Sequence, residues 1–229
     1  MMRATSLIIC DLDGTLYHTE TSFLPTMHRI YAEFGIAAPP DWETLALVGE
    51  TFEGVLDWVI GLGIAEDREI LARRITSAEF ASIAQNGRLY PGVPETLCEL
   101  RDRGAALAIC TNGDQDYTRT ILRTFGIETL FDAVRTHEDA KRTKTEMIAA
   151  LLEEFDPRCP FVVGDRRHDV EAGRANGCIV IGAVYGYARA GELDGADVRI
   201  KEFSELRGLI DGDDGAFRPP VGSIGDRSS

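Results

Sequence analysis

Two carboxylates stand two residues apart, directly after a short apolar run near the start of the sequence. The run covers residues 7–9, and Asp11 and Asp13 follow it. We interpret the run as a strand, and side chains two residues apart on a strand point to the same face. One carboxylate could then attack a substrate while the other moves a proton. Because Asp is also common in turns, this segment by itself favours a plain turn.

Thr111 and Asn112 follow a second apolar run, residues 105–110. Their hydroxyl and amide groups could bind phosphoryl oxygens at a strand end, although the same residues also suit a simple helix cap. Lys144 lies near the start of a predicted helix, where an ammonium could offset the charge between an attacking carboxylate and a phosphoryl group. Lys141 is a close alternative, since the chain has only three lysines.

Asp165 and Asp169 follow a third apolar run, residues 161–163. Mg²⁺ prefers hard oxygen ligands in octahedral geometry, and Asp165 could supply one opposite Asp11. Asp169 could orient Lys144 or a metal-bound water. Each segment alone also fits an ordinary turn or cap. Together the four segments predict phosphoryl transfer.

The elements that position these residues alternate between strand and helix. We predict strands at residues 7–9, 105–110, 133–135, 161–163 and 178–181, and helices at 94–103, 117–124, 146–155 and 169–176. This alternation is typical of an α/β fold with a parallel sheet covered on both faces. Ligands bind outside the carboxyl ends of the strands in such sheets, where the polar segments would lie.

Residues 17–90 interrupt this alternation with helical patterns and no convincing strand. We predict helices at 25–34, 51–60, 66–74 and 78–84, which together form a helical insertion after the first strand. Residues 211–229 are rich in Gly, Pro, Asp and Ser, and we expect a loose tail there.

The composition excludes several classes of protein. A chain of 229 residues with 44% hydrophobic content can build a substantial core. Its net charge of -14 argues against a general nucleic-acid or anionic-membrane surface. The five cysteines show no spacing typical of a zinc site or a disulfide framework. With no secretory signal or membrane span in the sequence, we expect a soluble cytoplasmic protein.

The four segments resemble, in order, the motifs of the haloacid dehalogenase superfamily, especially its phosphoglycolate-phosphatase-like branch. The matching segments are Asp11-Leu-Asp-Gly-Thr-Leu16, Thr111-Asn112, Lys144 and the run from Gly164-Asp165 to Asp169. The resemblance implies a Rossmann-like doubly wound core from residues 1–16 and 91–210, with residues 17–90 as a helical cap. It also implies a Mg²⁺ cofactor and an aspartyl-phosphate intermediate, with the backbone carbonyl of Asp13 as a further metal ligand.

The expected function is therefore hydrolysis of a small phosphorylated metabolite, such as a phosphoglycolate-like compound or a sugar or nucleotide phosphate. The dehalogenases of this superfamily do not need a second Asp, so the presence of Asp13 weighs against that activity. Its phosphonate hydrolases need a Schiff-base lysine in the cap, and residues 17–90 contain no lysine, which excludes that activity. A phosphosugar mutase and a phospho-acceptor signalling module remain as alternatives. Neither the particular substrate nor the oligomeric state follows from the sequence.

Two features of residues 17–90 could contribute to substrate recognition. Basic side chains that could meet a second anionic group are His18, His28, Arg29, Arg73 and Arg74. The segment Glu50-Thr51 resembles a cap loop that faces the active site in relatives.

Overall fold

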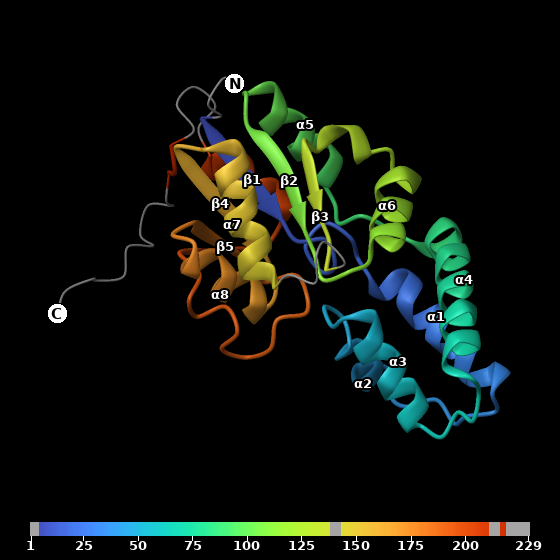
Figure 1. The fold of residues 1–229 in the computed structure, drawn as a ribbon. Helices are drawn as coiled ribbons and strands as arrows, with labels where there is room; N and C mark the ends of the chain where they lie inside the picture. The colour runs from blue at the N-terminus through green and yellow to red at the C-terminus, as the bar shows by residue number, and fades with distance from the viewer. Residues whose placement is uncertain (1–4, 138–142, 211–215, 219–229) are drawn as a thin grey trace.

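The computed structural model describes residues 5–137, 143–210 and 216–218. Its centre is a parallel six-stranded sheet with the order β3-β2-β1-β4-β5-β6 (Figure 1). The strands are β1 (Ser6–Cys10), β2 (Ala106–Cys110), β3 (Ala133–Arg135), β4 (Cys159–Gly164), β5 (Ile179–Ala183) and β6 (Val198–Ile200). The structure confirms the α/β prediction and all five predicted strands. It adds β6, a three-residue strand at the edge of the sheet beside β5.

Helices cover both faces of the sheet, as Figure 1 shows. The helices of this part are α5 (Val93–Asp102), α6 (Gln115–Thr124), α7 (Lys144–Phe155), α8 (Arg167–Ala175) and α9 (Leu206–Leu209). Side chains alternate along β1, so that Leu7 and Ile9 pack with α7 and α8. Ile8 and Cys10 pack on the opposite face with α5 and α6. A strand buried on both faces reads as a continuous apolar run, which is what the sequence shows.

Between β1 and β2 the chain forms α1 (Glu20–Glu33), α2 (Asp41–Leu45), α3 (Phe52–Gly61) and α4 (Arg68–Asn86), which lie to one side of the sheet (Figure 1). These helices share an apolar cluster of their own, which includes Met27, Val59 and Leu71. The predicted helical insertion is therefore present. The short helix α2 was not predicted.

Two predicted boundaries in this insertion are wrong. The predicted helices at 66–74 and 78–84 form one continuous helix, α4. Thr76 and Ser77 are weak helix formers, but the buried neighbours Ile75 and Ala78 hold the segment by packing. Helix α1 begins five residues before the predicted start, where the backbone N–H of Glu20 donates to the hydroxyl of Tyr187 at 2.8 Å.

The expected loose tail lies mainly outside the described residues, at 211–215 and 219–229. Of the described part, Phe217 pairs with Ile210 in an antiparallel bridge and contacts the ring of Phe161. Among the helices that the structure describes, none has the length and apolar character needed to span a membrane.

Candidate active site

The sheet order brings three of the predicted segments to one edge. β1 lies between β2 and β4, so the carboxyl ends of these three parallel strands are neighbours. Asp11, Thr111 and Asp165 are the residues that directly follow the three strands, and all three are buried. The backbone N–H of Asp11 donates to the carbonyl of Val163 at 2.9 Å, which continues the pairing of β1 with β4 past the strand end.

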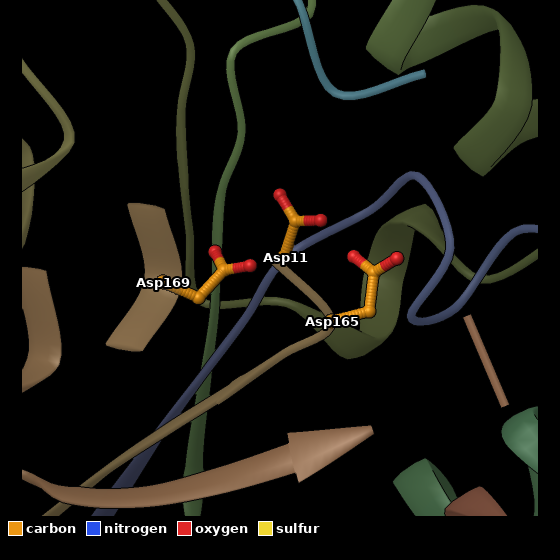
Figure 2. Close-up of side chains that lie close together, drawn as sticks. All are labelled: Asp11, Asp165 and Asp169. Carbon is orange, nitrogen blue, oxygen red and sulfur yellow. The ribbon is translucent and has the colours of Figure 1, made fainter. Parts of the chain in front are cut away.

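Three carboxylates converge at this edge. One oxygen from each of Asp11, Asp165 and Asp169 lies within 4.8 Å of the others, and Figure 2 shows the side chains facing a common space. One oxygen of Asp165, Oδ2, accepts the backbone N–H of Tyr187 at 2.6 Å. Its other oxygen, Oδ1, is buried without a hydrogen-bond partner among the described residues. Hard oxygen donors with one unpaired buried atom suit a Mg²⁺ ion.

Two glycines leave room for Asp165. A β-carbon at Gly14 or Gly186 would collide with the carboxylate of Asp165. Gly14 also has a φ of 78°, in the left-handed region that favours glycine. Gly14 therefore both permits the turn after β1 and leaves space for the carboxylate of Asp165.

Lys144 joins two of these carboxylates. Its Nζ lies 2.6 Å from Oδ1 of Asp11 and 2.5 Å from Oδ1 of Asp169, and all three side chains are buried. Lys144 is the first residue of α7, and the side chain of Thr143 caps this helix by accepting the N–H of Glu146. The alternative lysine, Lys141, lies outside the described residues.

The charges of Asp11 and Lys144 depend on each other. Burial raises the pKa of Asp11 to about 7, although Lys144 opposes this rise. Burial alone would lower the pKa of Lys144, but the carboxylates of Asp11 and Asp169 outweigh it and hold that pKa above its ordinary value. Lys144 is therefore positively charged and favours the ionised form of Asp11, which is the form that can attack phosphorus.

Asp13 is buried away from the carboxylate cluster. A shared strand face for Asp11 and Asp13 would require β1 to continue to Asp13, and β1 ends at Cys10. Instead the chain turns here, and Oδ1 of Asp13 accepts hydrogen bonds from Tyr117 at 2.5 Å and Thr19 at 2.8 Å. Burial raises the pKa of Asp13, and the two hydrogen bonds act in the opposite direction. This carboxyl group is suited to hold and release a proton.

Asp11 and Asp13 nevertheless line one cavity, which we call the inner cavity. Other predicted residues that line it are Thr111, Asn112, Lys144 and Asp169. The structure thus brings all seven predicted site residues together, with Asp165 in the adjoining carboxylate cluster. A helix cap also forms in the segment Thr111-Asn-Gly-Asp114, where the side chain of Asp114 accepts the N–H of Tyr117.

The loop before α3 closes over the inner cavity. Asn112 donates to the carbonyl of Gly49 at 3.1 Å, and the guanidinium of Arg166 donates to the carbonyl of Val48. Arg166 also pairs with the buried carboxylate of Glu192 at 2.9 Å. Glu50 lines the inner cavity, as its resemblance to a cap loop predicts, whereas Thr51 is the N-cap of α3.

The basic residues suggested for a second anionic group do not line this cavity. Arg73 pairs with Glu69, Arg74 with Glu33 and His28 with Asp41, all at the surface of the helical insertion. His18 stacks on Tyr90, and Arg29 is exposed.

Sequence reasoning missed Tyr117, Thr19 and Arg166 as site residues. Tyr117 and Thr19 reach Asp13 only because the helical insertion and α6 meet above the sheet, and no spacing rule shows such a contact. Arg166 does lie inside the predicted Gly164–Asp169 segment, so its position between the predicted site residues Asp165 and Asp169 was the available signal.

The chain matches a family model and several known proteins. The model described as haloacid dehalogenase-like hydrolase matches residues 8–183. A phosphoglycolate phosphatase of Haemophilus influenzae is 30% identical over 193 residues, which cover 79% of this chain and 86% of that protein. The tyrosine-protein kinase PtkA of Mycobacterium bovis is 30% identical over 198 residues, covering 84% of this chain and 66% of that protein.

A solved structure agrees with the fold. The crystal structure of a predicted phosphoglycolate phosphatase from Haemophilus somnus superposes with a TM-score of 0.80 and covers 91% of this chain and 99% of that one, at 24% identity. The matched residues 8–183 include every predicted site residue. The chain is therefore a member of the haloacid dehalogenase-like hydrolase family, on its phosphoglycolate-phosphatase-like branch.

Proposed function

We propose that this member of the family is a magnesium-dependent phosphatase that hydrolyses a small phosphorylated metabolite through an aspartyl-phosphate. The observation that carries the proposal is the buried Asp11 carboxylate, which lies 2.6 Å from the ammonium of Lys144 and beside the carboxylates of Asp165 and Asp169. The phosphatases among the relatives support the same activity.

The residues divide the work of the reaction as follows. The carboxylate of Asp11 attacks phosphorus, and the bond to the leaving oxygen breaks. Asp13 gives its proton to that oxygen and later takes a proton from the water that hydrolyses the aspartyl-phosphate, which restores both residues. Lys144, Thr111 and Asn112 hold the phosphoryl oxygens.

Asp11, Asp165 and the backbone carbonyl of Asp13 are the proposed Mg²⁺ ligands, and Asp169 supports them by holding Lys144. When bound, Mg²⁺ would offset the negative charge of the phosphoryl group. Without the positive charge of the ion, the Asp11 carboxylate and the phosphoryl group, which are both anionic, would have to approach each other in a buried site.

We further propose that residues 17–90 act as a cap over residues 1–16 and 91–210. The separate apolar cluster of α1–α4 supports this division, as do the hydrogen bonds from Asn112 and Arg166 to the loop before α3. A cap that closes on the bound ester would exclude bulk water from the reacting centre.

The first test is hydrolysis of p-nitrophenyl phosphate with Mg²⁺. Asp11→Asn removes the nucleophile and should lower kcat by at least about a thousandfold. Asp57→Asn, which makes the same change on the exposed face of α3, should retain wild-type activity. Chelation of Mg²⁺ should abolish turnover, and full activity of Asp11→Asn or of the chelated enzyme would refute the proposal.

The 30% sequence identity with the tyrosine-protein kinase PtkA supports a second candidate function, a phosphotransferase that passes the phosphoryl group to another acceptor. Steady release of inorganic phosphate over many turnovers would exclude it, and would also exclude a phospho-acceptor signalling module. Interconversion of sugar-phosphate isomers without phosphate release would instead show a phosphosugar mutase.

A further inference from the structure

A second cavity, the outer cavity, opens beyond Asp13 on the side of the helical insertion. Its apolar wall comes from Phe23, Phe52, Val55 and Ile75, and Asp13 lies at its boundary with the inner cavity. The cavity has a volume of about 60 Å³. At about 10–15 Å³ for each water molecule, this is space for roughly four to six waters, which is the size of a short alcohol group. Because Asp13 is the proposed proton donor to the leaving oxygen, that part of the substrate would extend into the outer cavity.

The charged residues of the outer cavity are all acidic. Asp13, Glu50 and Glu79 line it, and no lysine, arginine or histidine does so among the described residues. Three of the described basic residues line the inner cavity, and none of them lines the outer cavity: Lys144 pairs with Asp11 and Asp169, Arg166 pairs with Glu192, and His168 is the third.

Glu79 is a carboxylate without a partner among the described residues, and it is less exposed than Glu50. It lies on α4, half-buried, and forms no hydrogen bond or ion pair with any described residue. Burial raises the pKa of Glu79 to about 8, with contributions from the carboxylates of Asp13 and Asp114. The cavity therefore disfavours negative charge, and a bound cation would favour the ionised form of Glu79.

We propose that the outer cavity selects phosphate esters whose alcohol part is apolar and carries a protonated amine, and that Glu79 pairs with this amine. The proposal rests on the phosphatase function proposed above and names its substrate class. A substrate with a carboxylate in place of the amine, as in phosphoglycolate, would place a negative charge beside the carboxyl groups of Asp13 and Glu79, in a cavity that no lysine, arginine or histidine lines among the described residues. We therefore expect this chain to discriminate against phosphoglycolate, although its relatives include phosphoglycolate phosphatases.

Three esters of similar length test the charge preference: aminopropyl phosphate, butyl phosphate and the phosphate ester of hydroxypropanoate. With Mg²⁺ present, kcat/KM should fall in that order, by about tenfold at each step. Equal values for the amine and butyl esters, or a preference for the carboxylate ester, would overturn the proposal. If p-nitrophenyl phosphate is hydrolysed in the same preparation, such a result leaves the phosphatase function intact. If neither the three esters nor p-nitrophenyl phosphate releases phosphate, both proposals fail.

Variants of α4 assign the preference to Glu79. Glu79→Gln should reduce the ratio of kcat/KM for the amine ester over the butyl ester by about tenfold, and Glu79→Lys should favour the carboxylate ester. Glu69→Gln makes the first change at an exposed position on the same helix and should leave the ratio unchanged. Because both esters are measured on one preparation, the ratio is independent of the fraction of active enzyme. An unchanged ratio in Glu79→Gln would refute the role of Glu79.

Discussion

At the scale of single residues, Asp11 and Asp13 differ in their surroundings although they are two positions apart. Asp11 lies beside an ammonium, while Asp13 accepts hydrogen bonds from two neutral hydroxyl groups, those of Tyr117 and Thr19. The ammonium of Lys144 contacts the carboxylate of Asp11 directly, whereas no cation contacts Asp13 among the described residues. Such a difference assigns the proposed roles of nucleophile and proton carrier.

These roles predict a specific defect in Asp13→Asn. The variant can neither protonate an alkyl leaving group nor activate water, so kcat for butyl phosphate should fall by about a hundredfold or more. p-Nitrophenolate leaves without protonation, so the first step with p-nitrophenyl phosphate should persist. Rapid mixing should then show a burst of about one p-nitrophenolate per enzyme, followed by slow turnover. A linear time course at the wild-type rate would contradict this role of Asp13.

At the scale of elements, the turn between β4 and α8 connects the sheet edge to the helical insertion. Arg166 in this turn contacts both Glu192 and the carbonyl of Val48, and its side chain is buried. The same turn contains Asp165 and leads into Asp169, so the contacts to the insertion and to the carboxylate cluster share one short segment.

Loss of Arg166 should therefore destabilise the protein. Arg166→Met leaves the buried Glu192 without its main cation and should lower the free energy of unfolding by about 2–3 kcal/mol. Adding Glu192→Gln to Arg166→Met removes the unpaired negative charge and should recover part of the lost free energy of unfolding. Arg167→Met, at an adjacent and more exposed arginine, serves as the matched control with little effect. Urea unfolding of the four proteins measures this, and equal stability of Arg166→Met and the wild type would contradict it.

The elements of the sheet were the most predictable part of the fold. Strands buried on both faces leave apolar runs in the sequence, and Gly104, with a φ of 87°, marks the predicted end of a helix before β2. β6, a three-residue strand at the sheet edge, was not predicted. α4 was divided in two because local propensity is weak at Thr76 and Ser77, while the packing that overrides it comes from distant residues.

The carboxylate cluster was predictable for a similar reason, since the carboxyl ends of parallel strands must meet at one edge. The outer cavity was not. Its walls come from α1, α3, α4 and the α6 region, and their relative placement depends on tertiary packing that has no fixed spacing in the sequence.

At the scale of the whole molecule, the carboxylate cluster links metal binding to stability. Asp11, Asp165 and Asp169 are brought together by folding, so an ion that binds them favours the folded state. At a Mg²⁺ concentration about a hundredfold above Kd, Tm should rise by roughly 5 °C.

Thermal unfolding with and without Mg²⁺ measures this rise. Asp165→Asn should lose it, whereas Asp57→Asn, on the exposed face of α3, should keep it. The same rise in Asp165→Asn and the wild type would exclude Asp165 as a ligand.

The position of β1 in the middle of the sheet has a consequence for synthesis on the ribosome. Cys10 pairs with Ile109 on one side and with Val163 on the other. At typical elongation rates, about 150 residues separate the emergence of β1 from that of β4, a delay of roughly 10–30 s. Throughout that interval β1, the apolar strand that directly precedes the proposed nucleophile, lacks its β4 partner on one edge. The nascent chain must therefore keep this strand from pairing elsewhere until β4 arrives.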